Sequence, residues 1–152
     1  MLEYTVTARR NGPAAAVATC ARCPTAVLAL DTAPAGRADA FNPAELLLAS
    51  VAACMLKGIE RVAPLLKFRL EGAAVRVHGV RQDAPPRMTR IDYDLVIDTD
   101  ESDQRLDLLH QNVRKFGTIY NTVSAAVELT GRVRRGAVGD VTDLTRETAA
   151  RG

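Results

Sequence analysis

A single long helix in the middle of the chain constrains the fold more than any other feature. Residues 42–45 read Asn-Pro-Ala-Glu: an N-cap asparagine, a proline at the first helical position and the glutamate of a capping box. Residues 46–56 are apolar except for one serine, so the first half of the helix is apolar on every side. We therefore expect a central helix that other elements enclose. Pro64 predicts that the helix stops near Ala63.

Strand-like segments flank this helix on both sides. Their alternating or short apolar runs predict strands over residues 3–9, 14–20, 25–30, 73–81, 88–98 and 127–133. Asn11-Gly12 predicts a hairpin turn after the first of them. The segment 31–41 has little periodicity and predicts a loop, and residues 82–87, which contain two prolines, predict a linker.

The segment 88–98 is the clearest strand. Its alternation predicts an inward-facing row of four side chains: Ile91, Tyr93, Leu95 and Ile97. The side chains between them point outward, and there Asp92 or Asp94 can pair across strands with Arg76 or His78.

Two further helices follow this strand. Residues 102–116 carry apolar side chains at helical spacing, with Gly117 as a C-terminal cap. We expect the buried face of this helix to consist of Leu106, Leu109, Val113 and Phe116, and His110 to lie on its exposed side. A short helix over residues 121–125 precedes the last strand. The order of strands, helix, strands, helix and strand predicts an α+β fold.

Composition narrows the class of protein. The 152 residues are 47% hydrophobic and 25% charged, values typical of one globular domain. We expect that domain over residues 1–135 and a flexible tail over residues 136–152. A net charge of +2 and the lack of Trp argue against a nucleic-acid partner. The longest apolar run is too short to cross a bilayer, so we expect no membrane partner and a cytoplasmic location.

Cys54 is the first candidate for chemistry. A cysteine inside an apolar helix is most simply a small buried hydrophobe, and a reactive thiolate here would need a cation from another segment. Arg37, in the loop 31–41, is one such cation. Glu45 precedes Cys54 by nine residues, which places the two on opposite faces of one helix, and its capping role already explains it.

Cys20 and Cys23 form a Cys-Ala-Arg-Cys motif. Such a pair suggests half of a zinc site or a redox pair, but a second such motif is missing and the two histidines are far apart in sequence. The motif also falls among strands rather than at a helix start. We therefore expect no metal site and favour coincidence, with a redox role as the alternative. The sequence has no Gly-rich phosphate loop, and we expect no cofactor.

The central helix resembles the signature of a known family. Residues 42–54 read Asn-Pro-Ala-Glu-Leu-Leu-Leu-Ala-Ser-Val-Ala-Ala-Cys, and this segment is similar to the central helix of the OsmC/Ohr family of osmotically inducible and organic-hydroperoxide-resistance proteins. The approach Asp31-Thr … Gly36-Arg37 and the later Tyr120-Asn-Thr-Val also resemble that family. The likeness covers residues 4–133.

The resemblance implies an OsmC-like α+β fold in which antiparallel sheets wrap around a central buried helix. It also implies an interlocked homodimer with active sites at the subunit interface, so that a partner for Cys54 can come from the other chain. The implied activity is thiol-dependent reduction of lipophilic organic hydroperoxides in oxidative-stress defence. Cys54 would attack the peroxide, and Arg37 and Glu45 would hold and activate it.

Two positions depart from the family pattern. The family's resolving cysteine corresponds here to Gly117, and the catalytic glutamate of the hydroperoxide-resistance branch corresponds to Ala44, with Glu45 one step later. Three hypotheses follow. A small or protein thiol reduces oxidised Cys54 from outside, Cys20 or Cys23 has taken over as the resolving thiol, or the activity is lost. In the last case the chain is a binding protein for a small apolar ligand in which Cys54 is structural.

Overall fold

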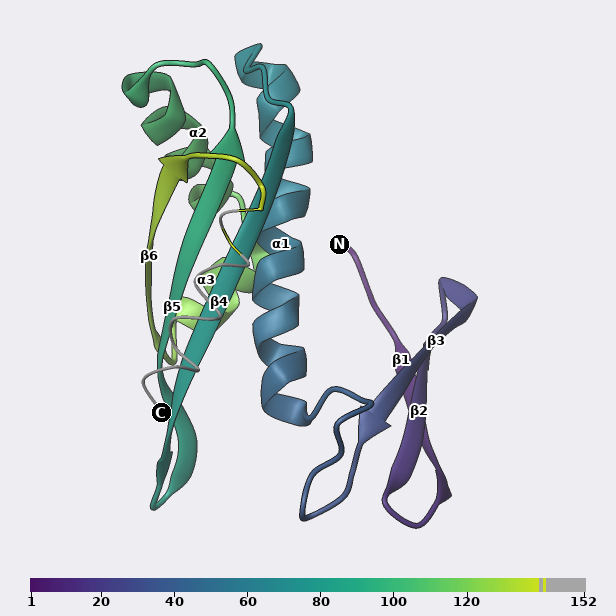
Figure 1. Ribbon diagram of the computed structural model, residues 1–152. Helices are drawn as coiled ribbons and strands as arrows, with labels where there is room; N and C mark the ends of the chain where they lie inside the picture. The colour runs from purple at the N-terminus through teal and green to yellow at the C-terminus, as the bar shows by residue number, and fades with distance from the viewer. Residues whose placement is uncertain (140, 142–152) are drawn as a thin grey trace. The chain divides into compact units, whose positions relative to one another are not determined.

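The computed structural model describes residues 1–139 and residue 141, and the chain forms two compact units (Figure 1). The first unit comprises Met1–Leu47, and the second begins at Leu48. Of the expected tail over residues 136–152, positions 140 and 142–152 lie outside the described residues. Within the described part of the chain, no helix has the length and apolar character needed to span a membrane.

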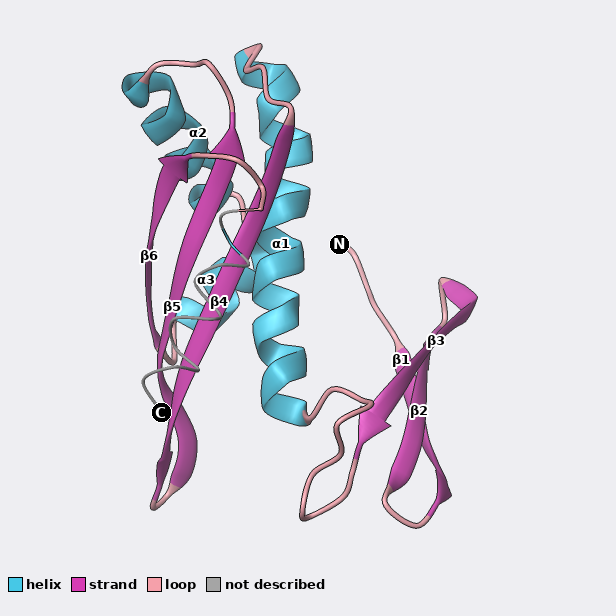
Figure 2. Ribbon diagram, viewed as in Figure 1, coloured by secondary structure: helices cyan, strands magenta, loops and turns pink. Residues whose placement is uncertain are grey.

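The first unit is built on a three-stranded antiparallel sheet of β1 (Val6–Gly12), β2 (Ala15–Cys20) and β3 (Cys23–Asp31) (Figure 2). The hairpin turn expected at Asn11-Gly12 is wrong, because both residues belong to β1. Gly12 pairs with Ala15, so the turn consists of Pro13 and Ala14, with Ala14 at φ 57°. Proline at the first turn position and the paired strands select this turn over the local Asn-Gly signal.

The central helix α1 (Pro43–Leu66) begins as the capping pattern predicts. The Asn42 backbone N–H donates to Glu45 Oε2 at 2.9 Å, and the Glu45 N–H donates to Asn42 Oδ1 at 2.9 Å. The expected end near Ala63 is wrong, because α1 continues through Pro64 to Leu66. Near the end of a helix, proline removes one hydrogen bond without stopping the last turn.

The second unit contains a sheet of β4 (Gly72–Asp83), β5 (Pro86–Asp98) and β6 (Glu128–Arg135). β4 and β5 are antiparallel, whereas β6 runs parallel to β5, so this sheet is mixed rather than purely antiparallel. The linker expected over residues 82–87 is wrong, because Asp83 pairs with Pro86 and only two residues form the turn. The expected cross-strand pairs are confirmed by the register, which places Arg76 opposite Asp94 and His78 opposite Asp92.

In the second unit, α1 from Leu48 onward, α2 (Asp103–Lys115) and α3 (Thr118–Ser124) belong to the same layer (Figure 1). Gly79 in β4 pairs with Ile91 in β5, and a Cβ atom on Gly79 would lie 3.0 Å from a methyl of Leu48 in α1. On the same face of β5 as Ile91, Tyr93 contacts His110 in α2. Both helices therefore cover one face of the sheet. The inward row predicted for β5 is confirmed, since each member is at most 4% exposed: Ile91, Tyr93, Leu95 and Ile97.

The expectation of an enclosed α1 is not met in a single chain. One stripe of the helix is buried: Val51, Met55, Ile59, Val62 and Ala63. Another face leaves Ala49, Ala53 and Leu56 exposed. An apolar face of this kind needs a further layer of protein before it is removed from water.

Two expectations for α2 are wrong. Phe116 is 52% exposed, because it is the C-cap residue, where the backbone leaves the helix, and its ring lies 5.3 Å from Lys115 Nζ. His110 is buried, because α2 turns this side toward β5, where Tyr93 supplies a polar partner. Leu106, Leu109 and Val113 are buried as predicted.

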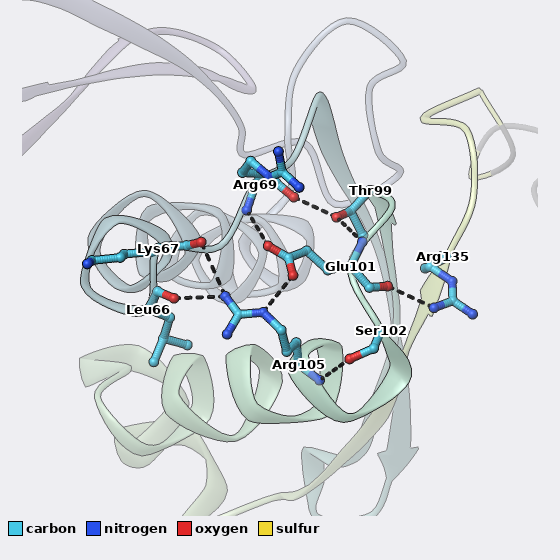
Figure 3. A network of polar contacts seen from close by, with 8 residues as sticks. All are labelled: Leu66, Lys67, Arg69, Thr99, Glu101, Ser102, Arg105 and Arg135. Carbon is cyan, nitrogen blue, oxygen red and sulfur yellow. Dashed lines mark hydrogen bonds and ion pairs between the residues drawn. The ribbon is translucent and has the colours of Figure 1, made fainter.

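A polar network fastens the C-terminal end of α1 to the start of α2 (Figure 3). Arg105 Nη2 donates to the Leu66 carbonyl at 2.8 Å and the Lys67 carbonyl at 3.2 Å, and Arg105 Nε donates to Glu101 at 2.6 Å. Glu101 also accepts the Arg69 N–H at 3.0 Å. The guanidinium therefore satisfies the carbonyl of the last residue of α1 and that of the residue after it, which would otherwise lack a partner within the helix.

Candidate functional site

Cys54 lies on α1 where this helix meets the segment between α2 and α3. Its side chain is half-buried and the thiol is free. A Cβ atom on Gly117 would lie 3.3 Å from Cys54 Sγ, 3.0 Å from the Val113 carbonyl oxygen and 3.0 Å from Tyr120 Cβ. The sulfur therefore faces a position that has no side chain.

The packing of α1 on α2 explains how the sulfur reaches this position. Gly58 follows Cys54 by one helical turn, and a Cβ atom on Gly58 would lie 3.0 Å from Val113 Cγ1. Val113 lies in α2, and Gly117 follows the C-cap residue Phe116. The two glycines thus allow α1 to pack closely on α2 and on the residue that joins α2 to α3, and this packing positions the thiol beside Gly117.

Arg37 lies in the loop after β3, and the buried carboxylate of Asp31 orders that loop. Asp31 Oδ1 accepts the Ala33 N–H and Asp31 Oδ2 accepts the Arg37 N–H, both at 2.9 Å. The Arg37 side chain forms a two-pronged ion pair with Asp39, with Nε–Oδ1 at 2.8 Å and Nη2–Oδ2 at 2.7 Å. The hydrogen bond to Arg37 lowers the pKa of Asp39, and the same bond raises the pKa of Arg37.

Glu45 lies in the first turn of α1 and fills the role that its spacing predicted, as the acidic half of the capping box. Its carboxylate is exposed, and Oε2 accepts the Asn42 N–H.

Arg37 and Glu45 line one groove of the first unit, with a volume of about 550 Å³. Leu28 and Phe41, which are 41% and 50% exposed, supply an apolar wall, and Asp39 adds a second carboxylate. The structure therefore brings together two of the three site residues that the resemblance implied. A groove with an apolar wall and a cation beside carboxylates suits a small amphipathic ligand.

Cys20 and Cys23 flank the turn between β2 and β3. They are cross-strand partners, and the Cys23 N–H donates to Cys20 Sγ at 3.2 Å. Both thiols are free, with Cys23 exposed and Cys20 half-buried. Within the described part of the chain, no three His, Cys, Asp or Glu side chains gather as a metal site would require.

The sequence did not indicate a buried polar pair beneath α2. The Tyr93 hydroxyl and His110 Nε2 share a 2.6 Å hydrogen bond, and their rings meet edge to face. Burial raises the pKa of Tyr93 to about 12, and burial together with Arg114 lowers the pKa of His110. Nearby, Arg114 Nε donates to the Tyr120 hydroxyl at 2.9 Å. Because both members of the Tyr93–His110 pair are neutral at pH 7, the pair stabilises the core without a buried charge.

Comparison with models of protein families assigns the chain to one family. The OsmC-like protein family matches residues 36–131, a span that includes Arg37, Glu45, Cys54 and Gly117. The chain belongs to this family. A comparison with curated protein sequences finds no match.

Solved structures share the fold. An OsmC-like protein from Mycoplasma pneumoniae is 22% identical with a TM-score of 0.80, and the match covers 90% of this chain and 99% of that one. An organic hydroperoxide resistance protein OsmC from Legionella pneumophila is 21% identical (TM-score 0.65), and OhrB of Bacillus subtilis, an organic hydroperoxide resistance protein, is 20% identical (TM-score 0.63). Each of these two matches covers 88% of this chain and 98% of the other. At such identities the likeness establishes the mixed α+β fold.

Proposed function

We propose that the protein is a thiol-dependent peroxidase that reduces lipophilic organic hydroperoxides through Cys54, in defence against oxidative stress. One observation carries this proposal: Cys54 Sγ lies against Gly117, the position that the family resemblance assigns to a resolving cysteine. That contact supports the correspondence of Cys54 to the family's peroxide-reducing cysteine and of Gly117 to its resolving cysteine. It also means that no thiol at position 117 can reduce oxidised Cys54, which favours regeneration from outside.

The reaction follows from the chemistry of one thiolate. The Cys54 thiolate attacks the distal oxygen of the hydroperoxide, the O–O bond breaks, and the alkoxide leaves as an alcohol after taking one proton. Cys54 becomes a sulfenic acid. A small or protein thiol then condenses with it to a mixed disulfide and releases water, and a second thiol displaces Cys54 as the reduced sulfur. Such a cycle requires a pool of reduced thiols, and we place the protein in the cytoplasm.

We further propose that a homodimer completes the active site. In this arrangement the groove that carries Arg37 and Glu45 in one copy receives Cys54 of a second copy. The exposed apolar residues of the single chain support it: Val6, Val27, Leu28 and Leu56. The apolar wall of Leu28 and Phe41 would bind the alkyl group of the peroxide, while Arg37 would stabilise the thiolate and the departing oxygen.

Complementation of two inactive variants tests the shared site. A mixed dimer of Cys54→Ser and Arg37→Gln chains contains one intact site if Arg37 and Cys54 come from different copies. Random mixing should then restore about one quarter of the wild-type turnover, because half of the dimers are mixed and each has one intact site of two. If the mixture stays as inactive as its components, the two residues do not form a site across a dimer.

One observation favours a different function. The Arg37 guanidinium is held by Asp39 on two hydrogen bonds, and a guanidinium so engaged is less available to a thiolate. The alternative is a binding protein for a small apolar ligand, with an inert Cys54. Turnover of cumene hydroperoxide with an excess of a small thiol separates the two functions. The peroxidase proposal requires that the wild type turns over the peroxide, that Cys54→Ser abolishes turnover, and that the double variant Cys20→Ser, Cys23→Ser retains it. Equal rates with and without Cys54 would contradict the proposal.

A further inference from the structure

The turn between β2 and β3 (Figure 1) is flanked by two cysteines that the peroxidase proposal does not use. Cys20 pairs with Cys23 at the end of the ladder, where the register shifts between Thr19 and Cys20. The Cys23 backbone N–H contacts Cys20 Sγ, so the two cysteines lie next to each other, one exposed and the other half-buried.

The sulfur of Cys20 accepts a hydrogen bond from the backbone of Cys23. The Cys23 N–H lies 3.2 Å from Cys20 Sγ, so the turn folds its own backbone toward this sulfur. A thiolate bound to a metal uses the same kind of N–H donor, which neutralises part of its charge and fixes its direction. The turn thus supplies a supporting hydrogen bond as well as two sulfurs.

The sequence spacing of the pair suits a shared metal ion. Cys-x-x-Cys is the spacing at which two thiolates commonly bind one ion. Two thiolates that share an ion at about 2.3 Å each can lie about 4 Å apart.

We propose that Cys20 and Cys23 form a two-thiolate site for a soft monovalent metal ion, Cu(I). Soft thiolate ligands select this ion, and Cu(I) is stable with only two of them. Zn²⁺ would need four ligands, and among residues 1–139 and 141 no cluster of three or more His, Cys, Asp or Glu side chains exists. Binding releases the two thiol protons and leaves a complex of charge −1. Arg22, within the same turn, supplies a compensating positive charge.

Titration with Cu(I) against a coloured Cu(I) chelator tests this site, under anaerobic conditions with a non-thiol reductant. The wild-type chain should withdraw one equivalent of Cu(I) from the chelator. Cys20→Ser and Cys23→Ser should each lose this stoichiometric binding, and circular dichroism should show that both remain folded. Cys54→Ser is the matched control and should bind like the wild type.

X-ray absorption of the loaded protein provides a second readout, and it should show two sulfur neighbours around copper. The proposal is overturned if the wild type fails to compete with the chelator, if either serine variant of the pair retains the ion, or if Cys54→Ser loses it. None of these outcomes depends on peroxide turnover, so the metal site and the proposed peroxidase activity are tested separately.

Discussion

The sulfur of Cys54 lies 3.3 Å from the point at which a Cβ atom would stand on Gly117. These residues belong to different helical segments, and the close approach of α1 and α2 at Gly58 brings them together. In a disulfide, Cβ of one cysteine lies about 3 Å from the sulfur of the other. A cysteine at position 117 would therefore stand within reach of Cys54, once Val113 and Tyr120, each 3.0 Å from the added Cβ, move by a few tenths of an ångström.

Restoring that thiol should change the mechanism. In Gly117→Cys, peroxide should convert Cys54 to an intramolecular disulfide, because the new sulfur stands beside the sulfenic acid before an external thiol arrives. Peptide mapping under non-reducing conditions should find the 54–117 link. The matched control is Gly117→Ser, which adds a side chain of similar size and should form no link. A Gly117→Cys chain that keeps both thiols free after peroxide would contradict the proposed chemistry at Cys54.

Two variants of the capping box separate the capping role of Glu45 from the catalytic role that we propose for it. Glu45→Gln keeps the hydrogen bond to the Asn42 N–H but removes the charge, so the free energy of unfolding should change by less than about 0.5 kcal/mol. Turnover should fall by about 100-fold if the carboxylate activates the thiol. Asn42→Ala keeps the charge but loses the cap, and it should cost about 1 kcal/mol of stability with turnover retained. Chemical denaturation and initial rates measure both effects, and an active Glu45→Gln enzyme would assign Glu45 to capping alone.

The buried pair of Tyr93 and His110 predicts a dependence of stability on pH. Because burial lowers the pKa of His110 in the folded state, the unfolded chain binds a proton more readily. The stability contributed by neutral His110 is therefore complete above the unfolded pKa of about 6.5 and declines as the pH falls through that value toward the lower folded pKa. Denaturation between pH 7.5 and 5 should show this decline.

The substitution His110→Gln should flatten that profile. Tyr93→Phe should lower the free energy of unfolding by about 1–3 kcal/mol, since it leaves buried His110 without its partner. An identical pH profile in wild type and His110→Gln would show that His110 does not titrate as its burial requires.

Two leucines of equal exposure test the proposed dimer. Leu28 on β3 and Leu108 on α2 are both 41% exposed. Leu28 borders the groove of Arg37 and Glu45, so Leu28→Asp should convert a dimer to monomers in sedimentation experiments and lower turnover with it. Leu108→Asp should leave the dimer intact, because Gln104, Asp107 and Gln111 surround it with a polar face. A wild-type chain that sediments as a folded monomer at all concentrations would rule out the dimer.

Local spacing explains which features the sequence predicts well. The N-cap of α1 involves residues three apart, and the asparagine and glutamate suffice to predict both of its hydrogen bonds. The inward row of β5 follows from strict alternation in the same way. By contrast, the Asn11-Gly12 signal fails because pairing with β2 determines where β1 ends.

Features that depend on tertiary packing could not be predicted from the spacing of residues in the sequence. Whether His110 is buried depends on which side of α2 faces Tyr93, a residue 17 positions away. Likewise, nothing near Cys54 in the sequence indicates Gly117 as its neighbour, and only the family resemblance connected the two. The groove was predicted only in part. The sequence predicts the loop that carries Arg37, but it does not indicate that the buried carboxylate of Asp31 orders this loop.

Trapping of the Cys54 sulfenic acid tests the central claim most directly. The reduced protein is treated briefly with a slight excess of cumene hydroperoxide in the presence of dimedone, and intact mass with peptide mapping locates the product. The account predicts one dimedone adduct per chain on Cys54 and none in Cys54→Ser. An unmodified Cys54 thiol after this treatment would contradict the account and identify the protein as one that uses this fold without peroxidase chemistry.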